Sequence, residues 1–65
     1  MELVVNGQPT AVISRNLAAL LVELSYEGTW LATAVNGTVV CRGDRDDHTL
    51  QDGDRIEILS PMQGG

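Results

Sequence analysis

Several residue types are missing or scarce in this 65-residue chain. Phenylalanine and lysine are absent, and Cys41 is the single cysteine. Because one cysteine cannot form an internal disulfide, the packing of aliphatic side chains must stabilise the fold without a cross-link. A chain that needs no disulfide suits a reducing compartment. We therefore expect one small cytoplasmic domain with a core of leucine, valine, isoleucine and alanine.

Positive charge is also scarce. Four arginines stand against nine acidic residues, which gives a net charge of −5. An acidic surface repels phosphate backbones and anionic lipids, so the composition argues against nucleic acid and membranes as partners. Two interpretations of the charge stay open. It could attract a protein partner with a basic surface, or it could simply keep a small domain soluble.

Long apolar runs are absent as well. The most apolar segment, LAALLVEL at residues 17–24, is interrupted by Glu23 and is far shorter than a membrane span. Glu2 stands where a secretory signal would carry positive charge. The sequence therefore predicts neither a membrane helix nor a leader.

Alternating side chains predict strands at both ends of the first 14 residues. Residues 1–6 and 10–14 have strand patterns, the second rich in β-branched side chains. Asn6-Gly7 lies between them and favours a tight hairpin turn, because both residues accept a positive φ. The two segments should pair as a hairpin.

The period changes after this hairpin. Asn16 can cap a helix, since its side chain can accept a hydrogen bond from an orphan backbone N–H. Leu17, Leu20, Leu21 and Leu24 follow at the spacing of one apolar helix face. Tyr26-Glu27-Gly28 should end the helix, with Gly28 as the C-terminal cap.

The second half of the chain returns to strands. Strand patterns cover residues 30–36 and 38–41, with Asn36-Gly37 as a tight turn between them, and the polar residues 42–55 offer only Leu50 as an apolar anchor. Residues 55–59, RIEIL, form the last strand. Pairing the first and last strands in parallel, with the helix across one face, predicts an α+β sandwich in the order ββαβ(β)β with a mixed sheet of four to five strands.

Five segments in this order resemble the ubiquitin-like β-grasp proteins, and among them the ThiS family of sulfur carriers in thiamine biosynthesis. They are MELVVNG, LAALLVEL, LATAVNGTVVCR, LQDGDRIEIL and the terminal Gly64-Gly65. No single segment is specific, but their order and spacing together are. Cys41 departs from the pattern, since proline is usual there, and GDRDDH is more acidic than its counterpart.

The resemblance implies a carrier and not an enzyme. A ThiF-type adenylyltransferase would use ATP and Mg²⁺ to activate the carboxylate of Gly65, with no cofactor bound to the carrier itself. A cysteine desulfurase would supply the sulfur, which would leave a thiocarboxylate on Gly65, and the thiazole synthase ThiG would then take this sulfur into the thiazole ring of thiamine. Sulfur carriers for molybdopterin synthesis or tRNA thiolation, a ubiquitin-like protein modifier and a plain interaction domain remain alternatives.

The C-terminal residues suit that chemistry on physical grounds. We expect a globular domain at residues 1–60 and a flexible tail at residues 61–65. Met62, Gln63 and Gly64 would thread into the active site of the partner, where only glycine permits close approach of the backbone. The six residues from Ser60 to Gly65 span at most about 20 Å when extended, which is enough to enter a neighbouring enzyme. A frayed terminus is the competing interpretation.

A docking face can be predicted from the alternation within the strands. If the larger apolar residues point at the helix, then Val4, Ala32, Ala34 and Leu59 lie on the opposite, open face of the sheet. An exposed apolar patch of this kind often marks a protein interface. Scattered small side chains that need no functional explanation are the competing interpretation.

The remaining reactive side chains point to structure more than to chemistry. Cys41 lacks an activating neighbour other than Arg42 and is expected to be a small apolar core or edge residue. His48 has no cysteine or second histidine beside it in sequence, so no metal site is predicted. Asp44, Asp46 and Asp47 should lie in a solvated loop, with contact to a basic partner as the alternative.

Overall fold

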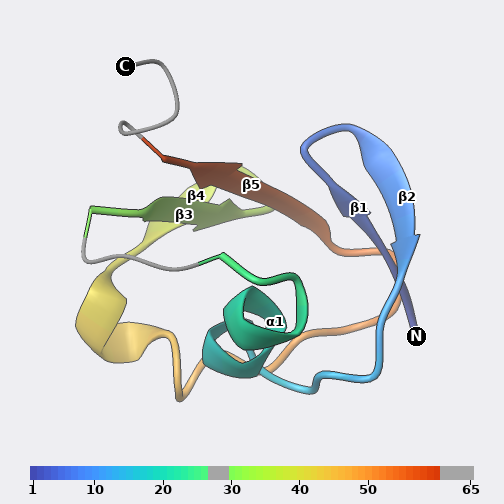
Figure 1. The fold of residues 1–65 in the computed structure, drawn as a ribbon, viewed down its shortest axis with the longest axis horizontal. Helices are drawn as coiled ribbons and strands as arrows, with labels where there is room; N and C mark the ends of the chain where they lie inside the picture. Colours follow the sequence, from blue (N-terminus) through green and yellow to red (C-terminus); the bar gives the residue numbers. More distant parts are fainter. Residues whose placement is uncertain (27–29, 61–65) are drawn as a thin grey trace.

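The computed structural model describes residues 1–26 and 30–60 of the chain. In these residues five strands form one mixed sheet in the order β2-β1-β5-β3-β4. The helix α1 lies across one face of the sheet, as Figure 1 shows. The bounds of the elements are β1 Glu2–Val5, β2 Gln8–Ala11, α1 Leu17–Glu23, β3 Ala32–Val35, β4 Thr38–Val40, a short 3-10 helix Arg42–Asp44, and β5 Arg55–Leu59. The predicted α+β order is confirmed.

The central strand of the sheet is β5. It pairs in parallel with β1 and antiparallel with β3. The first and last strands of the described chain therefore lie side by side in the sheet. Ile56 and Ile58 of β5 point to the helix side and are almost fully buried. The core also contains Leu3, Val5, Val12, Leu17, Leu20, Leu21, Val35, Val40 and Leu50.

The second strand begins and ends earlier than predicted. It covers Gln8–Ala11 instead of residues 10–14, because the two-residue Asn6-Gly7 turn returns the chain into pairing at once. Beyond Ala11 the backbone N–H groups of Ile13 and Ser14 donate to the carboxylate of Glu23 on α1. This side-chain partner takes the place of a strand partner.

The helix ends before the predicted cap. Asn16 caps the start as expected, with its Oδ1 accepting from the N–H of Ala19 at 2.8 Å. At the other end Ser25 adopts φ +63°, and the N–H groups of Ser25 and Tyr26 donate to the carbonyls of Val22 and Leu21. This pair of bonds is a Schellman motif. Ser25 therefore provides the positive φ expected of Gly28, which lies outside the described residues.

The polar segment after β4 contains a buried arginine, although the polar composition of this segment predicts exposed side chains. Arg45 is only 8% exposed, and its guanidinium donates to Thr33 Oγ1 at 3.1 Å and to the Leu31 carbonyl at 2.7 Å. Leu50 is buried as predicted. Cys41 is exposed, next to β4 at the sheet edge, so it is not a core residue. Among the described residues, no helix has the length and apolarity needed to cross a membrane.

Candidate functional site: the open face of the sheet

The face of the sheet opposite α1 carries the predicted docking residues. In β5 the burial alternates, with Arg55, Glu57 and Leu59 exposed between the buried isoleucines. Register places Ala32 beside Leu59 and Ala34 beside Glu57 across the β3–β5 pair. Because neighbours in register share a face, these side chains form one continuous surface, which we call the open face.

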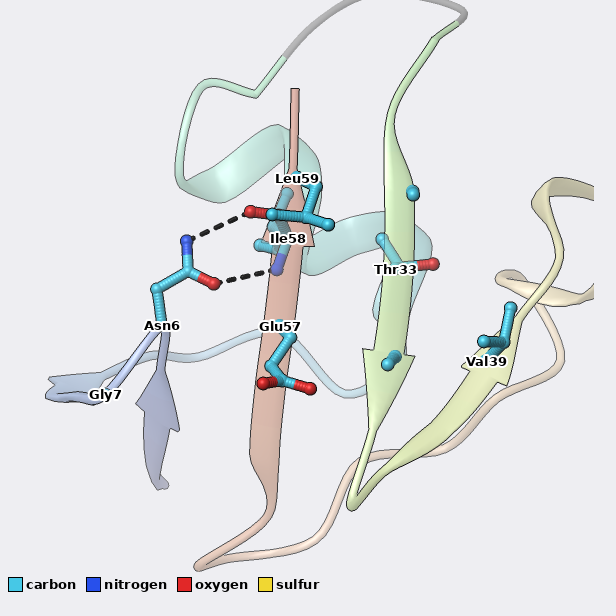
Figure 2. A pocket seen from close by; sticks show the side chains of 9 residues that line it. Asn6, Gly7, Thr33, Val39, Glu57, Ile58 and Leu59 are labelled. Carbon is cyan, nitrogen blue, oxygen red and sulfur yellow. Dashed lines mark hydrogen bonds between the residues drawn. The ribbon is translucent and has the colours of Figure 1, made fainter. Parts of the chain in front are cut away.

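Three of the four predicted residues line a single hollow on the open face. Ala32, Ala34 and Leu59 line it. Figure 2 shows this hollow from close by, with Leu59 labelled. Leu59 is 68% exposed, although it is one of the larger apolar side chains of the chain. The small alanines create the depression because they leave the space between their larger neighbours empty. An exposed apolar hollow is the kind of surface that proteins keep for a partner.

The structure adds Val39 to this hollow. Val39 lies opposite Ala34 in the β3–β4 pair and is 73% exposed. Sequence reasoning missed it because TVVC was assigned no inward and outward sides. The buried neighbour Val40 could have supplied that signal, since consecutive strand residues face opposite ways.

Val4 lies apart from the other three predicted residues. It is half-buried and lines an adjacent hollow, which shares Gly7 and Glu57 with the first. Val4 is paired with Arg55, so a cation and an anion of β5 stand next to this second hollow. The predicted docking surface therefore combines a hollow lined mainly by apolar residues with a neighbouring hollow lined by both Arg55 and Glu57. We define it by Val4, Ala32, Ala34, Val39, Glu57 and Leu59.

At the rim of the first hollow, Asn6 makes two hydrogen bonds to one residue of β5. Its Oδ1 accepts from the N–H of Ile58 at 2.8 Å, and its Nδ2 donates to the Ile58 carbonyl at 3.1 Å (Figure 2). Sequence reasoning assigned Asn6 only to the turn. The side chain was missed because its partner lies 52 residues away in the sequence.

The predicted tail sites follow this surface in the sequence. Met62, Gln63, Gly64 and Gly65 lie outside the described residues. β5, the strand that leads to them, ends at Leu59 on the hollow. The covalent connection alone therefore keeps Gly65 within six residues of the docking surface.

The other candidate residues lie elsewhere. Asp44, Asp46 and Asp47 are exposed in the segment after β4, and His48 is half-buried near them. In the described ranges, 1–26 and 30–60, the acidic, histidine and cysteine side chains form no group suited to a metal ion. The lowered pKa of Glu23, caused first by its hydrogen bond from Ser14, belongs to the connection between β2 and α1. The docking surface is thus the strongest candidate site in the described structure.

The fold and its open face define a class of protein. A five-stranded mixed sheet with β1 and β5 parallel at its centre and a helix across one face is the ubiquitin-like β-grasp arrangement. A crystal structure of the thiamine biosynthesis protein ThiS from Geobacter metallireducens superposes with a TM-score of 0.84 at 36% identity, covering 100% of both chains. A solution structure of a thiamine biosynthesis protein from the same organism gives a TM-score of 0.80 at 36% identity, over 100% of this chain and 88% of the other.

Sequence comparison gives the family. The ThiS family model matches residues 3–65. The sulfur carrier protein ThiS of Thermus thermophilus is 32% identical over 60 residues, which cover 92% of this chain and 94% of that protein. The chain therefore belongs to the ThiS family, a family of sulfur carriers in thiamine biosynthesis.

Proposed function

We propose that this chain carries sulfur for thiamine biosynthesis as a thiocarboxylate on Gly65, which donates the sulfur of the thiazole ring. The family match over residues 3–65 is the observation that supports it most, because the match includes the terminal Gly64-Gly65. In this proposal the chain has no catalytic activity of its own. A ThiF-type adenylyltransferase, a cysteine desulfurase and the thiazole synthase ThiG act on it in turn.

The chemistry requires activation of the tail. A terminal carboxylate with a pKa of roughly 3.5 is ionised at neutral pH and resists nucleophilic attack. Attack of this carboxylate on the α-phosphorus of ATP, with Mg²⁺ on the phosphates, releases pyrophosphate and leaves an acyl adenylate. Hydrosulfide then attacks the carbonyl carbon, AMP leaves, and loss of the proton leaves the carrier as a thiocarboxylate. Where a desulfurase delivers the sulfur as a persulfide, the acyl disulfide that forms is cleaved by a thiol, which is oxidised to a disulfide. ATP and Mg²⁺ belong to the partner and not to this chain.

The docking surface supports the step that precedes this chemistry. Leu59 and Val39 offer exposed apolar area, and Glu57 between the two hollows offers one negative charge. A partner with an apolar side chain beside a cation would complement this arrangement. Docking here would hold Leu59, the last residue of β5, against the enzyme. Met62, Gln63 and Gly64 could then lead Gly65 to ATP.

The test of the transfer step is a measurement of intact mass. The chain is incubated with a ThiF-type enzyme, ATP, Mg²⁺ and sodium sulfide. We expect the mass to rise by the difference between one sulfur and one oxygen atom, and a Gly65 deletion to abolish the change. Absence of both adenylate and thiocarboxylate would refute the proposal. Adducts between Gly65 and lysines of other proteins would indicate a ubiquitin-like modifier instead.

The test of the docking surface compares two exposed valines. Val39 is 73% exposed on the open face, whereas Val22 is 78% exposed on α1, which covers the other face. We expect Val39→Asp to raise the KM of adenylation about tenfold, because a charge placed in an apolar contact costs on the order of 1–2 kcal/mol. Val22→Asp should leave it unchanged. Equal effects of the two substitutions would show that the partner does not use the open face.

A further inference from the structure

The Asn6 side chain extends the pairing between β1 and β5 past the point where β1 ends. Val4 N–H donates to the Asp54 carbonyl at 2.9 Å, and Asn6 N–H donates to the Ile56 carbonyl at 2.8 Å. The Asn6 Nδ2 bond to the Ile58 carbonyl is the next step of the same series. Three donors thus reach the carbonyls of Asp54, just before β5, and of Ile56 and Ile58 within it, and the last donor is a side chain.

The amide of Asn6 acts here as an additional peptide group. The chain turns away at Asn6-Gly7, and the backbone pairing of β1 with β5 reaches only Ile56. Both the N–H and the carbonyl of Ile58 face this side, and both find their partner in Asn6. Tyr26 Oη lies 3.3 Å from the same Nδ2 and accepts a further bond from it, which restrains the amide.

The contact between Asn6 and Ile58 lies at the end of β5 that leads to the C-terminal residues. Ile58 is one residue before Leu59, the last residue of β5, and on its other side β5 pairs with β3 up to Ala32 and Leu59. With Asn6 in place, the end of β5 is held on both sides. Without it, the β1 side of the strand has no partner beyond Ile56. Asn6 therefore holds the β1 side of the end of β5, from which the sequence continues to Gly65.

We propose that Asn6 is a positioning residue for the reaction at Gly65, because its amide clamps Ile58 and so orients the end of β5 that carries the terminal segment. This inference rests on the proposed function. Correct orientation of reacting groups supplies a large part of enzymatic rate, and a displacement of about 1 Å can cost about 100-fold. Loss of the Asn6–Ile58 hydrogen bonds should consequently slow adenylation of Gly65 more than it weakens binding to the enzyme.

The experiment uses a matched pair of substitutions in the full chain. Asn6→Gly removes the clamp but keeps the turn, since glycine accepts the φ of +50° found at this position. Asn36→Gly is the control, because Asn36 has φ +51° and clamps the other end of β5, at Arg55. Asn6→Asp is a second variant that keeps the acceptor for the Ile58 N–H and loses the donor.

Two readouts separate positioning from general destabilisation. Adenylation by a ThiF-type enzyme is measured at saturating carrier, where partial unfolding raises the apparent KM but does not lower kcat. We expect kcat to fall about tenfold for Asn6→Gly, to fall less for Asn6→Asp, and to change by less than about twofold for Asn36→Gly. Amide exchange at Ile58, measured without any partner, should accelerate in Asn6→Gly only.

Each outcome decides the inference. An unchanged kcat for Asn6→Gly, or an equal fall for Asn36→Gly, would overturn it while the sulfur carrier function stands. Should Asn6→Gly not fold, Asn6→Asp at the wild-type kcat would overturn it in the same way. If the wild-type chain is never adenylated, the proposed function fails and the inference fails with it, whereas the exchange result at Ile58 still reports the clamp itself.

Discussion

The two Asn-Gly turns of this protein have the same local structure and different tertiary partners. Asn6-Gly7 has φ values of +50° and +82°, and Asn36-Gly37 has +51° and +85°. Both asparagines also bond to β5. Asn6 binds the N–H and the carbonyl of Ile58, near the end that leads to the tail. Asn36 accepts from the Arg55 N–H and donates to the Asp54 side chain, at the opposite end.

The same Asn-Gly dipeptide therefore forms the same turn at both positions and makes a different tertiary contact at each. The dipeptide determines the turn, because asparagine and glycine tolerate positive φ. What the asparagine amide contacts depends on which strand end lies beside it. Both turns close antiparallel hairpins, β1–β2 and β3–β4. Asn6 follows a strand that runs parallel to β5, so it lies toward the end of β5, whereas Asn36 follows a strand that runs antiparallel to β5, so it lies beside the start of β5.

The largest difference between the turns should appear when alanine replaces each asparagine. Asn6→Ala leaves both backbone groups of Ile58 unpaired and places alanine at positive φ, so we expect a loss of about 2–3 kcal/mol. Asn36→Ala should cost about 1–2 kcal/mol, because it leaves one backbone N–H of β5 unpaired. Urea unfolding followed by circular dichroism measures both. Equal losses would show that the Ile58 clamp adds no stability.

The glycines of the turns should behave alike. Gly7→Ala and Gly37→Ala each force a side chain into a left-handed conformation, and no atom lies within 4 Å of the added Cβ in either case. Strain alone then determines the effect, which we expect to be about 1–2 kcal/mol at both positions. A clear difference between the two midpoints of thermal unfolding would mean that the turns are not locally equivalent.

A third residue with positive φ offers the opposite change. Ser25 has φ +63° at the end of α1, a backbone conformation that glycine adopts more readily than serine. Ser25→Gly should therefore stabilise the protein by about 0.5–1 kcal/mol. The same unfolding assay tests it. A loss of stability would indicate that the serine side chain contributes a contact of its own.

The smallest effect concerns the Glu23 carboxylate, which accepts hydrogen bonds from the backbone N–H groups of Ile13 and Ser14. Its contribution to stability depends on pH, whereas that of the two asparagine amides does not. The hydrogen bond from Ser14 leads the causes that lower the pKa of Glu23 below its ordinary value of 4.5. Since the folded pKa is lowered, the stabilisation is fully present above this value and is lost as the pH falls through the folded pKa. The stability difference between wild type and Glu23→Gln should hence shrink as the pH falls from 4.5 through the lowered pKa of Glu23.

Asn6→Gly provides the reference for that titration. Its stability difference from wild type should not follow the same acidic decline, because neither an amide nor a backbone group titrates there. Unfolding midpoints at several pH values compare the two variants. A Glu23→Gln difference that stays constant into acid would refute the role of the charged form.

Much of the fold could be predicted from the sequence because its signals are local. The leucine spacing identified α1 and the alternation in RIEIL identified the two faces of β5, since each follows from the geometry of one element. The ends of the elements were harder. Strand β2 ends where Glu23 captures the backbone, and α1 ends where Ser25 turns left-handed, and neither event has a strong local signature.

The candidate site divides in the same way. Ala32, Ala34 and Leu59 were predicted from alternation and lie around one hollow. Val39 and Asn6 were missed because their contribution depends on residues brought beside them by strand pairing. Arg45 was missed because an arginine in a polar stretch is normally exposed, and only the packed structure supplies the oxygens that accept its hydrogen bonds.

The sequence alone determined the kinds of elements, the two turns and the apolar faces of α1 and β5, because backbone preference and hydrophobic period act over a few neighbouring residues. The tertiary structure decided which asparagine holds Ile58, which alanines share a hollow and which arginine is buried. Those outcomes depend on contacts between residues far apart in the chain, and such contacts exist only once β1, β3 and β5 lie side by side.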